Sequence, residues 1–371
     1  MTAELRMVLH PLEIPLRHAW TIAHGTRTVQ RNLVVELVEG EHRGYGETAS
    51  IPYFGVTTED LARLLEGVRG LIERTRWREP AELWAALDPH LPGPAGRFAL
   101  CAVDEAAHDL WGRRAGRPTG DLLCEAHPGL VGGTPASDYT IGMAAPDVMA
   151  AKLREYPGFP VYKVKVGAGC LSHDLALLQS MRDTLDRLGS AARLRVDANC
   201  AWTADAVAAC TRRLADLGVE FLEQPLPRDA PAAEHAAARA ASVLPIIADE
   251  SCINPGDVAA CDGLFDGINI KLTKCGGMTP ALEMVADARA RGLLVMMGCM
   301  TETTVGISAI AQLLPFLDFV DMDGALLLAH DVADGARVVD GVAHLPDRPG
   351  HGIRWRGPLD ERRTSDPARH E

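Results

Sequence analysis

Two lysines stand two positions apart inside a short apolar segment, Val161–Gly167. The valines and the closing glycine predict that this segment is a buried strand. Because side chains alternate between the two faces of a strand, Lys163 and Lys165 point the same way. For such a pair taken alone, an edge strand with two solvated lysines is the simpler interpretation. The polar groups that end later apolar segments favour a chemical role instead.

Three acidic residues end successive short apolar segments: Asp197 in DAN, Glu223 in EQP and Asp249 in DES. Each acid alone is better explained as a helix N-cap or a surface residue. Together, at one end of an apolar barrel, the three carboxylates would repel one another and be poorly solvated. A divalent cation removes both costs, and oxygen ligands without a nearby His or Cys favour Mg²⁺ over Zn²⁺. The pattern therefore predicts a magnesium site.

A further lysine, Lys274, follows the sixth of the eight strands expected below, whereas Lys165 ends the second. In a closed ring of eight strands these two positions lie opposite each other, so the two lysines would face each other across the mouth of the ring. A substrate carbon between them could lose a proton to one lysine and regain it from the other, which inverts a carbon α to a carboxylate. A lysine is a base only when neutral, and both Lys163 and the cation disfavour the charged form of Lys165. The cation would also stabilise the enediolate. Lys271 is the alternative second base, and Lys274 is preferred because it lies nearer the mouth.

The elements that must position these groups alternate regularly from about residue 138 to residue 331. Short apolar strands and helical patterns repeat about eight times, with strand cores at 139–142, 161–166, 194–197, 220–223, 245–249, 267–271, 293–297 and 319–321. Such alternation predicts parallel strands that close into a barrel, with chemistry at the C-terminal strand ends. An open doubly wound sheet is the alternative, but no GxGxxG follows the first strand.

The flanking parts of the chain follow other patterns. Strands are expected at 4–16, 32–39 and 42–48, and helices after Thr57 and at 97–112, which together predict an α+β module. After residue 331 the alternation stops. A hairpin at 337–345, with its turn at Asp340-Gly341, could return to that first module.

Composition excludes several classes of function. The 371 residues, 47% of them hydrophobic, suit a barrel plus a smaller module, and the net charge of −13 argues against a nucleic-acid or anionic-membrane partner. No apolar run is long enough to span a membrane, and residues 1–6 lack a signal-peptide pattern. Nine cysteines without CxxC spacing indicate reduced thiols. We therefore expect a cytoplasmic enzyme.

The ordered motifs KxK, DxN, EQP, DES and KxxKCGG resemble the enolase superfamily, in particular its muconate-lactonizing subgroup. The likeness extends to the DLWG stretch at 109–112 and the PGHG stretch at 349–352. It implies an α/β fold: a modified (β/α)7β TIM-type barrel at 131–331, one helix fewer than counted above, and an α+β capping domain formed by 1–130 with 332–371 returning to it. It also implies Mg²⁺ on Asp197, Glu223 and Asp249, an acid/base pair at Lys165 and Lys274 with Lys163 beside it, and a homo-oligomer.

The reaction depends on Asp321 and Asp323, which face one way at the end of the last strand and need a cationic partner. The alternative is a loop start with an Asp cap. Dipeptide epimerases of the subgroup use such a DxD to bind the substrate α-ammonium, and the stretch 297–302 resembles their GCMxE pattern. By this resemblance Thr140 and Met300 join the substrate-binding set. The expected reaction is inversion of the Cα of the C-terminal residue of a dipeptide by two-base proton transfer.

Specificity for the second residue is expected to depend partly on the loop at 21–27. Members that act on L-Ala-D/L-Glu often carry an arginine there, whereas this chain has His24 or Gly25 at that place and Arg27 close by. His24 is therefore a candidate substrate contact, against the simpler interpretation of a solvated loop histidine. The competing functions are a muconate cycloisomerase, an o-succinylbenzoate synthase or an N-acylamino acid racemase, whose substrates lack a free α-amine, and a non-catalytic barrel.

Overall fold

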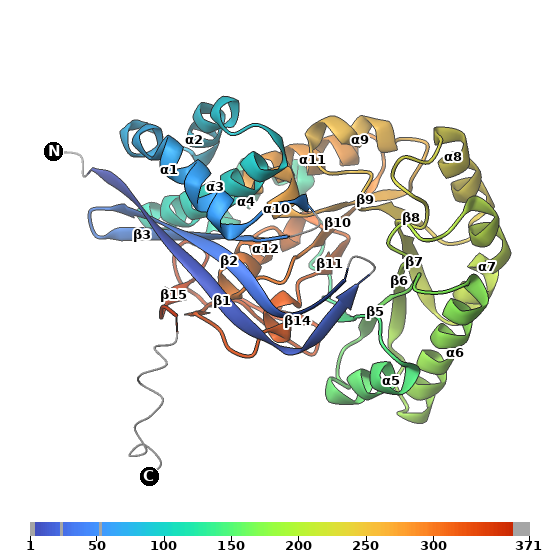
Figure 1. Cartoon of the computed structure of the whole chain (residues 1–371). Helices are drawn as coiled ribbons and strands as arrows, with labels where there is room; N and C mark the ends of the chain where they lie inside the picture. The colour runs from blue at the N-terminus through green and yellow to red at the C-terminus, as the bar shows by residue number, and fades with distance from the viewer. Residues whose placement is uncertain (1–3, 23–24, 52–53, 359–371) are drawn as a thin grey trace, which may run out of the picture.

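The chain folds into an antiparallel sheet with its own helices and a parallel barrel beside it (Figure 1). This computed structural model describes residues 4–22, 25–51 and 54–358. The antiparallel sheet has the order β1-β2-β3, with β1 at Leu5–Ile22, β2 at Gly25–Glu39 and β3 at His42–Ala49. Its helices are α1 (Thr58–Arg74), α2 (Pro80–Leu87), α3 (Gly93–Ala115) and α4 (Thr119–Ala126). This arrangement confirms the α+β module, but the expected loop at 21–27 is wrong for its described residues, which continue β1 and β2 and pair with each other.

Helix α3 packs closely against β3 because two glycines of the strand leave room for it. A Cβ at Gly44 would lie 2.1 Å from the Ala106 carbonyl oxygen, and one at Gly46 would lie 2.2 Å from the Ala102 carbonyl oxygen. The apolar side chains of the sheet and helices then form one core, which includes Leu33, Leu37, Leu65, Phe98 and Val103. This close contact fixes the position of β2 and β3 relative to the helices. It therefore also fixes the hairpin that β1 and β2 form.

Eight parallel strands form the barrel, in the order β4 to β11 around the sheet. The strands are β4 (Tyr139–Ile141), β5 (Val161–Lys165), β6 (Arg193–Asp197), β7 (Val219–Glu223), β8 (Ile246–Ala248), β9 (Gly267–Ile270), β10 (Leu294–Gly298) and β11 (Phe319–Asp321). The helices are α5 (Pro146–Glu155), α6 (Leu171–Arg187), α7 (Ala204–Asp216), α8 (Ala232–Ala241), α9 (Pro255–Cys261), α10 (Leu272–Cys275), α11 (Met278–Ala290) and α12 (Thr304–Ala311). Each of the seven steps between strands is helical, which confirms the (β/α)7β arrangement and corrects the count of eight strand–helix units.

The barrel closes nearly completely where the first and last strands meet. Ser137 forms a parallel bridge with Val320, and the backbone N–H of Met322 donates to Ser137 Oγ at 3.0 Å. Arg195, from β6, reaches across the interior and donates to the Val320 carbonyl at 2.8 Å. An arginine inside the barrel thus takes part in joining the two ends of the sheet.

The segments after the barrel return to two different places. The hairpin of β13 (Arg337–Val339) and β14 (Val342–His344) turns at Asp340 and Gly341, both with positive φ, as the Asp-Gly pair predicts. It lies against the barrel, where Ser137 N–H donates to the Gly341 carbonyl at 2.8 Å, so the expectation that this hairpin returns to the first module is wrong. Strands β12 (Ala333–Asp334) and β15 (Arg354–Trp355) pair with each other beside the antiparallel sheet, and Trp355 stacks on Tyr45. The boundaries 1–130, 131–331 and 332–371 remain our proposed division of the chain.

None of the helices in the described residues combines the length and the apolar character needed to cross a membrane.

Candidate active site

A row of charged side chains crosses three neighbouring strands at the C-terminal end of the barrel. Lys165 is paired in register with Asp197 on the next strand, and Asp197 with Glu223 on the strand after that. Asp249 follows immediately after β8. The parallel topology puts these strand ends at one edge of the sheet, so residues up to 84 positions apart in the chain become neighbours. All three carboxylates are buried.

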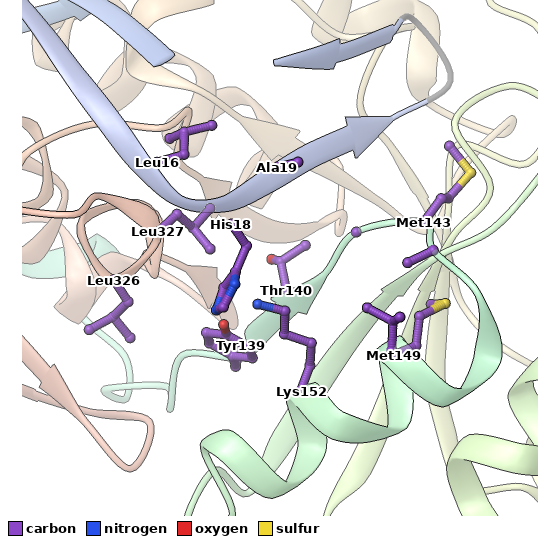
Figure 2. Close-up of a pocket in the computed structure, with 13 residues that line it drawn as sticks. Leu16, His18, Ala19, Tyr139, Thr140, Met143, Met149, Lys152, Leu326 and Leu327 are labelled. Carbon is purple, nitrogen blue, oxygen red and sulfur yellow. The ribbon is translucent and has the colours of Figure 1, made fainter. Parts of the chain in front are cut away.

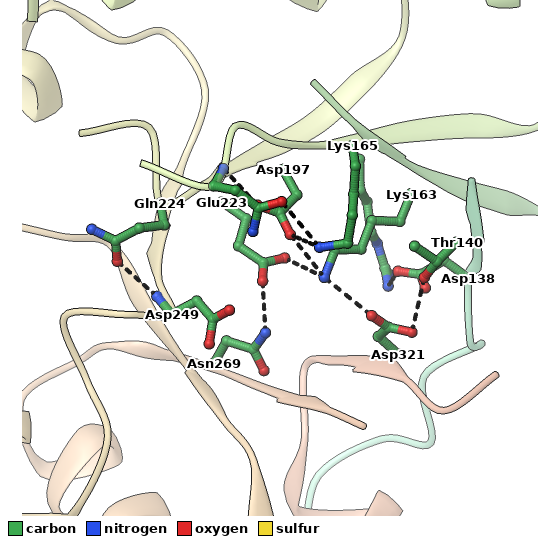
Figure 3. Close-up of polar contacts among 12 residues, drawn as sticks. Asp138, Thr140, Lys163, Lys165, Asp197, Glu223, Gln224, Asp249, Asn269 and Asp321 are labelled. Atoms are coloured by element: carbon green, nitrogen blue, oxygen red, sulfur yellow. Dashed lines mark hydrogen bonds and ion pairs between the residues drawn. The ribbon is translucent and has the colours of Figure 1, made fainter. Parts of the chain in front are cut away.

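Lysines hold the buried carboxylates in place (Figure 3). Lys163 Nζ lies 2.8 Å from Glu223 Oε2, 3.1 Å from Asp321 Oδ2 and 3.5 Å from Asp197 Oδ2. Lys165 Nζ donates to Asp197 Oδ2 at 2.7 Å and to Asn199 Oδ1 at 3.2 Å. Lys163 therefore links the predicted metal-binding acids to the predicted amine-binding acids.

Lys271 and Lys274 both contact Asp249. Lys271 Nζ donates to Asp249 Oδ2 at 2.9 Å, and Lys274 Nζ pairs with Asp249 Oδ1. The two lysines are three positions apart across the single turn of α10, a spacing that brings side chains to one side of a helix. The whole chain contains only five lysines, and these two join Lys163 and Lys165 at the mouth of the barrel. The sequence-based choice between Lys271 and Lys274 thus concerns two adjacent groups.

The three carboxylates are close enough to affect one another electrostatically. Burial raises the pKa of Glu223 above its ordinary value, and the neighbouring Asp197 adds to the rise. Burial has the same tendency at Asp197 and Asp249, but the lysines beside them outweigh it, and the pKa of each lies below its usual range. Burial alone would lower the pKa of Lys163, yet Glu223, Asp321 and Asp197 raise it well above the ordinary value. The charged forms of Asp197, Asp249 and Lys163 are therefore stable in this buried site because each lies beside a group of opposite charge.

The donor set fits a hard divalent cation. It consists of carboxylate oxygens on three adjacent strands, and Asp197 and Asp249 each raise the pKa of Glu223, so the three repel one another. Neighbouring groups orient these acids: Asn269 Nδ2 donates to Glu223 Oε1 at 2.9 Å, and Asn199 N–H donates to Asp197 Oδ1 at 2.9 Å. Oxygen ligands with this charge are those that Mg²⁺ prefers.

Asp321 and Asp323 form a second acidic pair at the end of β11. Thr140 contacts both: its N–H donates to Asp323 Oδ2 at 2.6 Å and its hydroxyl to Asp321 Oδ1 at 3.3 Å. Burial opposes ionisation of Asp321, but Lys163 outweighs it and lowers the pKa to about 2, whereas burial and Asp321 raise the pKa of Asp323 well above its ordinary value. Of the described residues, the one close group of metal-type ligand atoms is Cys299 with these two acids, within 4.8 Å. A thiol is a poor Mg²⁺ ligand, so this pair suits an organic cation better.

A cavity of about 80 Å³ lies between these groups. Its walls include Lys163, Lys165, Lys271, Asp249, Asp321, Asp323, Thr140 and Met300, and Arg27 reaches it from the hairpin of β1 and β2. Lys274, Asp197 and Glu223 lie behind this surface. His24 falls outside the described residues, so its predicted role has no structural account here. The other predicted residues all lie at this end of the barrel, but the ligand atoms of Asp197, Glu223 and Asp249 do not all lie within 4.8 Å of one another, because lysines stand between them.

Several supporting residues were missed by sequence reasoning. Gln224, in a backbone conformation with φ of 35°, accepts hydrogen bonds from the N–H groups of Asp249 and Ser251, both at 3.0 Å, and so positions the next strand end. Arg195 pairs with Asp138 at 2.7 Å beneath the site. Arg195 lies two positions before Asp197 and therefore on the same face of the strand. This spacing was the signal from which the role of Arg195 could have been predicted. Glu250 also lines the cavity, and burial next to Asp249 raises its pKa to about 7.

The chain is similar to known proteins over most of its length. The family described as "Enolase C-terminal domain-like" matches residues 148–359. An L-Ala-D/L-amino acid epimerase of Maribacter sp. is 42% identical over 94% of this chain and 99% of its own length. The solved L-Ala-D/L-Glu epimerase of Bacillus subtilis, in a substrate-liganded complex, superposes with a TM-score of 0.87 at 28% identity, covering 96% of this chain and all of its own. A dipeptide epimerase of Enterococcus faecalis, complexed with Mg and L-Leu-L-Tyr, has a TM-score of 0.85 at 30% identity, covering 95% and 99% of the two chains.

Proposed function

We propose that this chain, which belongs to the enolase superfamily and within it to the dipeptide epimerases, inverts the Cα of the C-terminal residue of a dipeptide. The observation that carries the proposal is the placement of two lysine pairs around three buried carboxylates, with a separate acidic pair beside them. The Enterococcus relative, solved with Mg and a dipeptide, supports the same class of substrate and cofactor.

Asp197, Glu223 and Asp249 would hold Mg²⁺. When bound, the ion supplies positive charge that attracts the substrate carboxylate and offsets the negative charge that develops when the adjacent Cα loses its proton. Lys163, ion-paired with Glu223 at 2.8 Å, adds a fixed positive charge at the same place. Together these groups lower the cost of forming the enediolate.

Lys165 and a lysine that follows β9 would be the two bases. Lys274 is the choice made from the sequence, whereas Lys271 is the one of the two that lines the catalytic cavity, so both are candidates for the second base. The two bases come from β5 and from the turn after β9, four strands apart in the sheet order, and so approach the mouth from different sides. One neutral lysine removes the Cα proton, and the ammonium of the other returns a proton to the opposite face of the carbon. Both are largely enclosed, which keeps solvent protons away from the carbon between the two steps.

Asp321 and Asp323 would bind the free α-ammonium at the other end of the substrate. Their carboxylates already have a hydrogen-bond donor, Thr140, and one cation, Lys163, and an additional ammonium would balance the remaining charge. N-acylamino acid racemases, o-succinylbenzoate synthases and muconate cycloisomerases act on substrates without this amine. The acidic pair therefore favours a dipeptide epimerase over these alternatives.

The test is chiral chromatography of dipeptides incubated with the purified protein and Mg²⁺. Starting from an L,L-dipeptide, we expect the epimer with a D residue at the C-terminal position, and no change at the N-terminal position. Chelation of the metal with EDTA should stop the conversion, and added Mg²⁺ should restore it. No conversion of any dipeptide in a broad panel would rule the function out.

A further inference from the structure

A second cavity, of about 340 Å³, adjoins the active site on the side of β4. Its lining includes Met143, Ala144, Val148, Met149, Leu326 and Leu327, and we call it the Met143 cavity. Figure 2 shows Met143 and Met149, from the loop after β4 and helix α5, on one side of the cavity, and Leu326 and Leu327, from the turn after β11, on the other side, beneath β1. Two residues, Thr140 and Leu327, line both this cavity and the catalytic one.

The shared wall is the part of the site that would bind the substrate amine. Thr140 donates to Asp323 Oδ2 from its N–H and to Asp321 Oδ1 from its hydroxyl. An ammonium held by these two acids therefore lies beside Thr140. The carbon that carries this ammonium also carries the side chain of the N-terminal residue, so that side chain starts beside Thr140, which lines both cavities.

The interior of the Met143 cavity is mainly apolar, and its charged groups are already matched. His18 Nε2 lies 3.2 Å and Lys152 Nζ 3.4 Å from different oxygens of Glu155. His18 and Glu155 are well exposed, with side-chain exposures of 52% and 37%, so this ion group forms the solvent-facing edge. A charged side chain in the interior would lose hydration without gaining a partner, whereas an aliphatic one would be removed from water.

We propose that the Met143 cavity receives the side chain of the N-terminal residue, so that the enzyme accepts dipeptides that begin with a large aliphatic residue such as L-Leu. This inference rests on the proposed function. The volume is at the lower end of the range for small-molecule pockets, which leaves room for one large side chain rather than a further residue. A further residue would also convert the ammonium into an amide and remove the charge that Asp321 and Asp323 bind.

The experiment compares kcat/KM for L-Leu-L-Ala and L-Ala-L-Ala in the full-length protein with Mg²⁺. For the wild type we expect L-Leu-L-Ala to be epimerised at least as efficiently as L-Ala-L-Ala. The A144F substitution places a ring in the cavity from an exposed loop position. It should lower kcat/KM for L-Leu-L-Ala about tenfold more than it lowers kcat/KM for L-Ala-L-Ala.

The matched control is A151F, which adds the same ring at an exposed position of α5 that does not line the cavity. It should leave the ratio of the two kcat/KM values unchanged. If the wild type epimerises L-Ala-L-Ala but not L-Leu-L-Ala, or if A144F lowers both equally, the inference about the Met143 cavity is wrong while the proposed function stands. If neither dipeptide, nor any other in a broad panel, is epimerised, the proposed function itself fails.

Discussion

Asp197 and Glu223 are direct cross-strand partners at the C-terminal ends of β6 and β7, and both are fully buried. Two carboxylates in this position cannot both be ionised without a nearby positive charge. In this structure Lys163 contacts both of them, at 3.5 Å and 2.8 Å. Lys163 thus supplies part of the positive charge that these two acids require, and the pair remains part of our proposed Mg²⁺ site.

Replacing either proposed base should stop epimerisation while leaving part of the proton chemistry. In K165A we expect kcat for epimerisation to fall by about 10²–10⁴-fold, and an equal fall in K271A or in K274A identifies which of these two lysines is the second base. Each variant that lacks one base should still exchange the Cα proton of one epimer with solvent, because the remaining lysine faces that proton. ¹H NMR of each epimer in D₂O measures this directly.

The control for charge at this position is K165R, which keeps a cation beside Asp197 but cannot act as a base at neutral pH. It should bind Mg²⁺ and remain inactive. Full activity in K165R would contradict the two-base assignment. So would a K165A variant that exchanges the Cα proton of neither epimer.

Mg²⁺ should stabilise the folded protein. A ligand that binds only the native state adds about 2.7 kcal/mol to the free energy of unfolding at a hundredfold excess over its Kd. We expect the Tm to rise with Mg²⁺ concentration, and D249N to abolish most of this rise because it removes one of the three proposed charged ligands. Differential scanning calorimetry, with D262N as the control at an exposed acid of the same barrel, measures the effect. An equal Mg²⁺-dependent rise in D249N would show that the ion binds elsewhere.

Loss of Asp321 should weaken recognition of the free amine. A hydrogen bond to a charged group contributes about 1.5–3 kcal/mol, so kcat/KM of D321N for a free dipeptide should fall by about 10–100-fold. The reference is D334N, at an acid on the exposed edge of β12, which should behave like the wild type. N-acetylated dipeptides should be poor substrates of the wild type. Unchanged activity of D321N on free dipeptides would move the assignment toward an enzyme of the same subgroup without an amine site.

Glu302 should make stability depend on pH. Burial, with Glu47 nearby, raises the pKa of Glu302 to about 8. Between the ordinary value of about 4.5 and 8, the folded state binds more protons than the unfolded state, so the free energy of unfolding falls as the pH rises through this window. The contribution is on the order of a few kcal/mol.

The E302Q variant cannot ionise and should lose less stability between pH 5 and pH 8.5 than the wild type. Urea denaturation at both pH values measures this difference, with E283Q, at an exposed position of α11, as the control. Identical pH profiles of E302Q and the wild type would mean that Glu302 does not carry this titration.

The sequence predicted the parts of the site that depend on local pattern. Lys165, Asp197 and Glu223 each end a short apolar strand, and parallel topology then places all such ends together. The rest depends on contacts between distant segments. Arg195 and Asp138 are 57 positions apart, and the Met143 cavity exists only because β1 meets the loop after β4. Local periodicity contains no information about either contact.

The choice between Lys271 and Lys274 shows the same limit at short range. The expectation that Lys271 lies inside or beside the barrel did not foresee that one turn of α10 would bring both ammonium groups to Asp249. The motif indicated the strand on which the proposed base lies, but the turn after the strand leaves Lys271, and not Lys274, in the wall of the cavity.

The most direct test of the account is the fate of the Cα protons of an L,L-dipeptide in D₂O with the wild-type protein and Mg²⁺. We predict that the C-terminal Cα signal disappears by deuterium incorporation while a second, D-configured epimer accumulates, and that the N-terminal Cα proton is retained. Retention of protium at the C-terminal Cα across a panel of dipeptides would contradict the central claim.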